Sequence, residues 1–143
     1  EPHVRLYDAF EIVLDHLGDA EVGGPLMVRF ELALLEELGF GLDLSRCAAT
    51  GAGEDLAWVS PRTGRAVSRA AGEPWRDRLL PLPRFLVDRT MNAPPDAEAV
   101  AAGFRLAGFF LDRHVLAPRG AAMLRERDLL VAALGRALAT AEA

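Results

Sequence analysis

The chain has 143 residues, of which 51% are hydrophobic and 26% charged, and its formal net charge is −5 at pH 7. These values are those of one ordinary globular domain. No apolar run approaches the roughly 20 residues that a transmembrane helix needs, so we expect no membrane-spanning helix in this chain. The single cysteine, Cys47, excludes an internal disulfide and is consistent with a reducing cytoplasm, and no signal peptide is visible.

Two helices are predicted near the start of the chain. The first covers roughly Val4 to Leu17, where apolar residues recur at helical spacing, and Gly18 stops it. A connection follows over Glu21–Pro25. Pro25 suits the first turn of the second helix, where its missing N–H costs nothing.

The second helix is apolar nearly all round, which predicts a central position among several neighbours. Phe30, Ala33, Leu34 and Leu38 recur along it at helical spacing, so we expect them to form a buried face. Gly39 stands where a helix commonly ends in a left-handed residue.

A change of character begins at Leu42 and lasts to Trp75, where glycines and turn residues replace helical periodicity. Two short apolar runs, residues 56–60 and 65–68, flank a turn that starts with Pro61 and ends with Gly64. This pattern predicts a short β-hairpin. A lone hairpin is marginal in water, so it must pack on the helices or be held by something else.

Helical patterns return after Trp75. They cover Pro81 to Met91, then Asp96 to Leu116, which is the longest periodic stretch, and finally about Ala122 to Ala141. In the last helix the inward-facing residues are predicted to be Leu124, Leu130, Val131, Leu134 and Leu138. The fold class that follows is mainly α, a helical bundle with an inserted β-hairpin.

One run of residues resembles a known family. Arg29 to Cys47 reads R-F-E-L-x-L-L-x-x-L-G-[FY]-x-x-x-L-x-x-C, which is similar to the C-terminal domain of RecO, a bacterial recombination mediator of DNA repair. The order of the later elements agrees, so the resemblance covers nearly all of the chain. It implies one helical domain over residues 1–143 with a hairpin insertion at about 42–75. Because Glu1 replaces an initiator methionine, we expect a fragment, and the resemblance implies a missing N-terminal OB-fold that binds single-stranded DNA.

The resemblance also implies a degenerate zinc knuckle in the hairpin. Many relatives carry two C-x-x-C pairs here, which can close a tetrahedron of thiolates around zinc. In this chain the pairs read Cys47-Ala-Ala-Thr50 and Ser68-Arg-Ala-Ala71, so three of the four ligands are gone. We therefore expect no metal and no other cofactor, a knuckle that keeps its shape, and apolar packing by Trp58 or Val59 in place of the metal. Cys47 itself is expected to be a small buried hydrophobic residue.

The distribution of charge points to two kinds of partner. Residues 1–60 carry twelve acidic residues against three arginines, whereas residues 61–90 carry seven arginines against three acidic residues. A basic turn with aromatic neighbours can contact the phosphates of single-stranded DNA and stack a base. It can equally bind an acidic protein or be an ordinary solvated loop. The candidate DNA-binding residues are Arg62, Arg65, Arg69, Arg76 and Arg78.

A second candidate site lies on the second predicted helix. The RecO resemblance implies a groove for the C-terminal tail of single-stranded DNA-binding protein, an acidic peptide with an apolar end. An apolar slot with an arginine at its rim would bind such a tail, and Arg29, Phe30 and Leu34 are the candidates. Glu31 and its acidic neighbours weaken the expectation, and Phe30 and Leu34 can equally be ordinary core residues.

No catalytic motif is present, and His3, His16 and His114 are scattered, so we expect a protein that is not an enzyme. The resemblance implies an adaptor in the RecFOR-type pathway, active in recombination after DNA damage. It would bind a RecR-like protein, single-stranded DNA-binding protein and DNA, and promote recombinase loading and strand annealing in the bacterial cytoplasm, near the nucleoid. The alternative from composition alone is a helical ligand-binding or regulatory domain with no nucleic-acid role.

Overall fold

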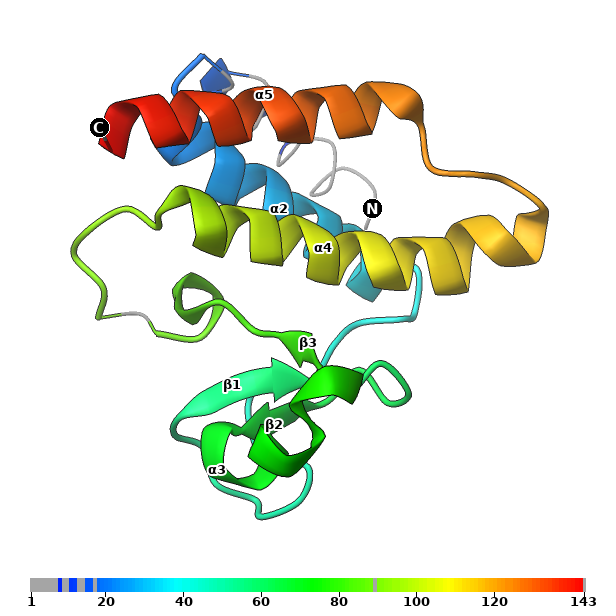
Figure 1. The fold of residues 1–143 in the computed structure, drawn as a ribbon. Helices are drawn as coiled ribbons and strands as arrows, with labels where there is room; N and C mark the ends of the chain where they lie inside the picture. Colours follow the sequence, from blue (N-terminus) through cyan, green and yellow to red (C-terminus); the bar gives the residue numbers. More distant parts are fainter. Residues whose placement is uncertain (1–7, 9–10, 13–14, 17, 89, 143) are drawn as a thin grey trace.

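The computed structural model describes residues 8, 11–12, 15–16, 18–88 and 90–142. It consists of a layer of helices stacked on a small sheet (Figure 1). The predicted mainly helical fold with an inserted hairpin is confirmed. The helix predicted over roughly Val4 to Leu17 lies largely outside the described residues.

Helix α2 covers Ala20–Glu37 and begins earlier than the sequence predicted. Asp19 is its N-cap, and the Asp19 side chain accepts a hydrogen bond from the Glu21 backbone N–H at 3.1 Å. Pro25 therefore lies inside the helix and not in its first turn, and the expected connection over residues 21–25 is helical. Gly23, Gly24 and Pro25 are buried, and Gly24 lets α2 approach Val100, because a Cβ at Gly24 would lie 3.1 Å from a Val100 methyl group. Tertiary packing outweighs the poor local helix propensity.

The buried face of α2 also differs from the expected one. Val28, Glu31 and Leu35 are buried, whereas Ala33 is exposed and Leu38 is 41% exposed. The apolar residues surround the helix, so their spacing alone does not identify the face that meets its neighbours. The predicted end at Gly39 is confirmed by a left-handed φ of 91°.

A three-stranded antiparallel sheet forms the lower layer, with strand order β2-β1-β3. The predicted hairpin is present as β1 (Leu56–Val59) and β2 (Ala66–Ser68). A third strand, β3 (Leu80–Pro81), pairs with β1 and was not predicted. It occupies the start of the helix predicted over Pro81 to Met91. Among the described residues of that span, the helical part is a 3-10 turn at Arg84–Leu86.

The chain between β2 and β3 is helical in short pieces. Helix α3 (Arg69–Gly72) is capped by the Ser68 side chain and continues into a 3-10 helix over Glu73–Arg78. Gly72 is required at the junction, because a Cβ there would lie 2.3 Å from the Trp58 ring. The close approach fixes this helical segment against β1.

Helix α4 (Ala97–Leu111) lies between two hydrophobic cores. The Asp96 side chain caps it, and a π-helical turn continues it over Asp112–Leu116, in agreement with the predicted span. Leu106 and Phe110 belong to the core shared with the sheet. Val100 and Phe104 belong to the core shared with α2 and the last helix.

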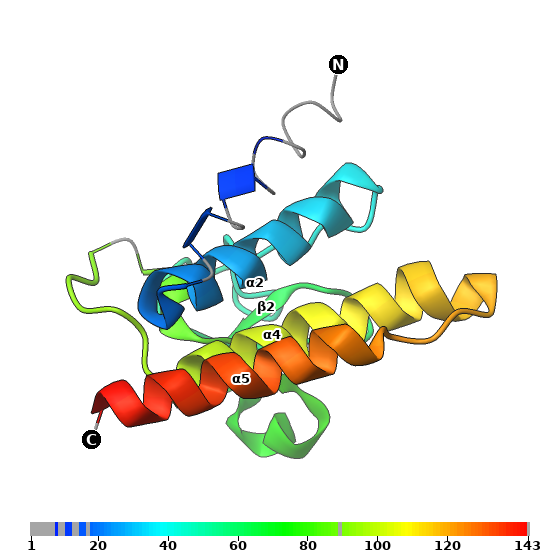
Figure 2. The same cartoon turned by 90° about the horizontal axis from the view of Figure 1, so that it is seen from above.

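Helix α5 (Arg125–Glu142) completes the helical layer. Seen from above, α5 overlies α4 and α2 lies beside them (Figure 2). The predicted inward residues Leu134 and Leu138 are buried, but Leu124 precedes the helix and is 69% exposed. None of the helices in residues 18–88 and 90–142 combines the length and apolar character needed to cross a membrane.

Candidate nucleic-acid interface

The hairpin turn holds two arginines outward on a rigid backbone. Ser60 and Arg65 close the turn, with the Ser60 N–H donating to the Arg65 carbonyl at 3.0 Å, and Gly64 supplies the left-handed residue with a φ of 70°. The side chains of Ser60 and Thr63 accept hydrogen bonds from the backbone N–H groups of Arg62 and Arg65. Both arginines are exposed. The turn therefore presents two cations whose backbone positions are fixed.

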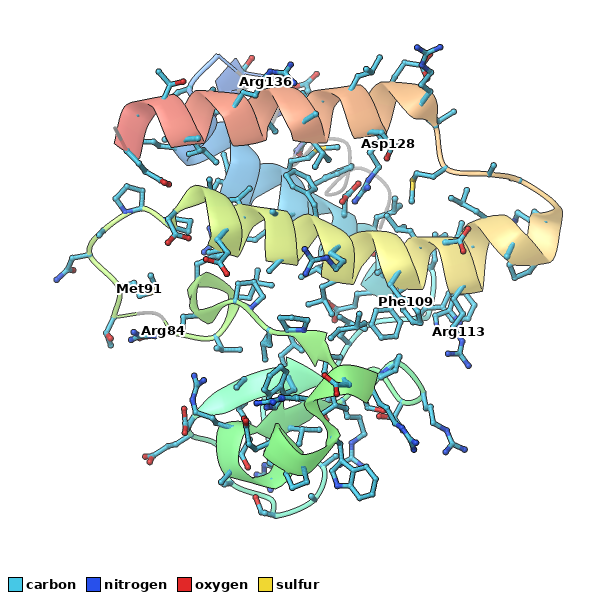
Figure 3. The ribbon with its side chains drawn as sticks, in the orientation of Figure 1. Arg84, Met91, Phe109, Arg113, Asp128 and Arg136 are labelled. Atoms are coloured by element: carbon cyan, nitrogen blue, oxygen red, sulfur yellow. The ribbon has the colours of Figure 1, made fainter. Side chains whose placement is uncertain are left out.

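A third arginine approaches the same turn from the π-helical continuation of α4. The Arg113 guanidinium donates to the Pro61 carbonyl at 2.8 Å, and Figure 3 shows Arg113 directed toward the hairpin. The two residues are 52 positions apart in sequence, so no local pattern could have identified this neighbour. Arg113 both anchors the turn and adds positive charge beside it.

One carboxylate offsets part of this charge. Asp43 pairs with Arg65 as an isolated β-bridge next to the hairpin. Hydrogen bonds from the Ser45 side chain and backbone lower the pKa of Asp43 below its usual range, and Arg65 and Arg46 lower it further. Asp43 is therefore ionised at neutral pH, and the turn keeps a net positive charge only because arginines outnumber it.

The five arginines predicted to bind DNA do not form one cluster of free cations. Arg69 pairs with Asp55 at 3.2 Å and Arg76 pairs with Glu73 at 2.8 Å, both on the exposed surface. Arg78 lies over the Trp75 ring, 6.0 Å from its centroid. Within the described part of the chain, no ion pair closer than 4.0 Å includes Arg62 or Arg65. Arg78 likewise forms no such ion pair, so Arg62, Arg65 and Arg78 are the candidates whose charge no carboxylate within 4.0 Å offsets among the described residues.

The four knuckle positions are brought together. Cys47 is buried, its sulfur accepts a hydrogen bond from the Ser68 backbone N–H at 3.2 Å, and its thiol lies 3.6 Å from the Ser68 hydroxyl. The Ser68 hydroxyl in turn accepts from the Ala71 N–H at 3.3 Å. Burial raises the pKa of the Cys47 thiol, but hydrogen bonds from Thr50 and Ser68 outweigh it and lower the pKa to about 6. Hydrogen bonds thus join the two halves of the knuckle where relatives are expected to use metal.

Apolar packing supports the same knuckle. Val59 is fully buried in the core under α4, and the Trp58 ring covers Gly72 while its Nε1 donates to the Arg69 carbonyl at 3.5 Å. In the described part of the chain, no three His, Cys, Asp or Glu side chains are grouped so that they could hold a metal ion. One thiol, two hydroxyls and a methyl group are a poor donor set for zinc.

The three residues of the candidate peptide site on α2 differ in how far they are buried and in what they contact. The exposed Arg29 donates to the Phe85 carbonyl at 3.0 Å and lies 5.5 Å from the centre of the Phe85 ring. Leu34 packs against the core near the sheet, and Phe30 is half-buried. Arg29 is thus partly engaged within the domain, and Leu34 contributes mainly to its core.

The two histidines that the structure describes, His16 and His114, each make a contact within the domain. His16 contacts the Ile12 carbonyl at 2.8 Å, and His3 lies outside the described residues. The His114 ring stacks on Phe40 with a centroid distance of 4.8 Å and also faces Phe110 at 5.9 Å. This stacking gives His114 a packing role.

The helical layer and its hydrogen-bonded knuckle define a helical domain with a zinc-knuckle-like insertion. The family described as "Recombination protein O C terminal" matches residues 1–122. This chain belongs to the RecO family, and the predicted resemblance is confirmed.

Its relatives are named as DNA repair proteins. The chain is 56% identical over 138 residues to DNA repair protein RecO of a Rhizobium etli strain, which covers 96% of this chain and 54% of that relative. It is 57% identical over 136 residues to DNA repair protein RecO of a Methylorubrum extorquens strain, with 92% and 55% covered. The chain therefore spans about half the length of these relatives. No solved structure matches it significantly.

Proposed function

We propose that this chain is an adaptor domain, not an enzyme, in a mediator of recombinational DNA repair. Membership of the RecO family supports the repair role. The proposal includes an OB-fold in the rest of the protein, a RecR-like partner, and promotion of recombinase loading and strand annealing near the nucleoid. The domain would contribute contacts to single-stranded DNA and to the tail of single-stranded DNA-binding protein.

The hairpin turn carries the DNA part of the proposal. Arg62 and Arg65 are exposed, held by a hydrogen-bonded turn, and close to Arg113. Phosphate oxygens would replace the water around their guanidinium groups, which can form bidentate hydrogen bonds with phosphate. Arg69 and Arg76 already have carboxylate partners and would contribute less.

Reversing the charge of the turn tests this contact. In the full-length protein, Arg62→Glu combined with Arg65→Glu should weaken binding to an oligo-dT strand about tenfold or more at low salt. The slope of log K against log salt should also become shallower, because each lost phosphate contact removes released counterions. Fluorescence anisotropy across a salt series measures both quantities.

A matched control carries the same change of charge elsewhere. Arg125 and Arg136 are exposed on α5, and Figure 3 shows Arg136 on the side of the molecule opposite the hairpin. Their double reversal should leave affinity and slope near those of the parent protein. Equal losses in both variants would mean that only net charge matters, and the hairpin contact would be rejected.

The peptide part of the proposal rests on Arg29. Its guanidinium has five N–H donors, so the bond to the Phe85 carbonyl leaves donors for a carboxylate. Arg29→Ala should reduce affinity for an acidic, apolar-ended tail peptide about tenfold. Removal of the peptide's apolar terminal residue should nearly abolish binding. Unchanged affinity alongside a lower melting temperature would assign Arg29 to the domain's own packing.

A further inference from the structure

Trp75 is an exposed aromatic residue on a well-fixed backbone. The residue is 58% exposed, although tryptophan has a large apolar ring that folding usually buries. The 3-10 helix that carries it follows directly from α3 and has Pro74 in its first turn. It ends at Arg78, just before β3 joins the sheet. Trp75 is therefore exposed on a segment with regular structure, between α3 and β3, and not at a chain end.

A hollow of about 330 Å³ lies beside the Trp75 ring. Val67, Ala71 and Leu79 contribute apolar walls, and Ser60 and Thr63 contribute hydroxyl groups from the hairpin turn. Each hydroxyl oxygen accepts a backbone N–H, which leaves its own proton available to a ligand. The hollow thus combines one aromatic wall, small apolar walls and two hydrogen-bond donors.

The surroundings of the hollow are mainly cationic. Arg62 and Arg65 lie next to its hydroxyl residues in the turn, and Arg78 stands over the Trp75 ring. In the 3-10 helix that carries Trp75, Glu73 forms an ion pair with Arg76 and the other acid is Asp77, so Arg62, Arg65 and Arg78 outnumber the one carboxylate without an ion pair among these described residues. The ligand that best fits these features has a flat ring with polar edges, attached to an anionic chain.

We propose that this hollow receives one unpaired nucleobase of single-stranded DNA, stacked on Trp75. The inference rests on the proposed DNA contact and adds a specific subsite to it. Stacking on an aromatic side chain tolerates any base, because every base has a π-face. The Ser60 and Thr63 hydroxyls would contact the polar base edge, while Arg62, Arg65 and Arg78 follow the phosphates. A paired base would remain inside its duplex, so the subsite selects single strands.

The test separates bases from phosphates. Oligo-dT and an abasic oligonucleotide of the same length carry the same phosphate charge, but only oligo-dT offers bases to stack. In the full-length protein, Trp75→Ala should weaken oligo-dT binding about tenfold or more and leave the salt slope unchanged. The same variant should bind the abasic strand as the parent does. Trp75→Phe keeps an aromatic face and should recover most of the lost affinity.

Two results would overturn the subsite. An unchanged oligo-dT affinity in Trp75→Ala, with Arg62→Glu/Arg65→Glu still weakened, would reject base stacking and keep the basic turn. An equal loss on oligo-dT and the abasic strand would show that Trp75 acts through the fold and not through a base. Melting curves on each variant identify that case. If the arginine variant also binds normally, the proposed DNA contact itself is wrong.

Discussion

Glu31 is a buried charged residue in the helical layer. It is 4% exposed on α2, and two hydrogen bonds of 2.6 and 2.7 Å join it to the Arg127 guanidinium on α5. Arg127 also donates to the Phe104 carbonyl at 3.0 Å and lies over the Phe104 ring. The hydrogen bonds that Arg127 donates to Glu31 raise the pKa of Arg127 above its usual range, so the guanidinium stays charged. The pair ties three helices together at one point.

Removing one member should cost more than removing both. Glu31→Ala leaves the Arg127 charge buried without a partner, and the free energy of unfolding should fall by about 3–5 kcal/mol. The double variant Glu31→Leu/Arg127→Met replaces both charges with apolar groups and should recover much of the loss. Urea unfolding measures each difference. Glu37→Ala, on the exposed end of α2, is the control and should change stability by less than about 0.5 kcal/mol.

The contact between α4 and α5 depends on a glycine in α4. Gly108 leaves room for Arg127, because a Cβ there would lie 3.2 Å from both terminal guanidinium nitrogens. A glycine inside a helix normally costs about 1 kcal/mol relative to alanine. Gly108→Ala should nevertheless destabilise the domain, since the ion pair to Glu31 prevents Arg127 from moving aside.

Gly135 provides the matched comparison on α5. Apart from the backbone of its own helix and its chain neighbours, no atom of the described residues lies within 4 Å of a Cβ added there, so Gly135→Ala should gain roughly 0.5–1 kcal/mol from helix propensity alone. Thermal melts of the two variants should therefore move in opposite directions. A gain in both would show that Arg127 can shift without cost.

Elements with a strong local pattern were predictable from the sequence. The α4 span follows from long apolar periodicity and the Asp96 cap, and the hairpin follows from a turn with Pro61 and Gly64 at its ends. The RecO-like run over Arg29–Cys47 identified the family. The predicted peptide and DNA sites remain predictions.

Other features depend on contacts between distant residues, and the sequence pattern could not identify them. Pro25 is helical because its segment is buried against α4 and α5, which local propensity does not reveal. The two-residue strand β3 is too short for a periodic signal and exists through pairing with β1. Arg113 reaches Pro61 across the sheet–helix boundary, and Glu31 reads as a surface acid until Arg127 is placed beside it.

Helix α4 connects the two halves of the molecule, because it contributes residues to both hydrophobic cores. Phe104 packs toward α2 and α5, while Phe110 packs toward the sheet. Loss of either core therefore exposes part of α4 and weakens the other. We expect the hairpin and the helices to unfold in one transition.

Two optical signals test this cooperativity. Both tryptophans, Trp58 and Trp75, lie in the hairpin segment, whereas far-ultraviolet circular dichroism reports mainly the helices. In this 143-residue chain the two urea curves should share one midpoint. Gly72→Ala, which forces a Cβ against Trp58, should lower both midpoints together. Separate midpoints would show that the hairpin unfolds as an independent unit.

The hydrogen-bonded knuckle has a consequence for the conditions in which the protein can work. Oxidants convert exposed zinc thiolates to disulfides and release the metal, and zinc starvation empties such sites. Here the Cys47–Ser68–Ala71 hydrogen bonds and the buried Val59 hold the same segments, and the one thiol is 1% exposed. The melting temperature should stay unchanged after chelator or mild peroxide treatment, and purified protein should contain well under one zinc per chain. The knuckle would then keep its shape under oxidising or zinc-poor conditions.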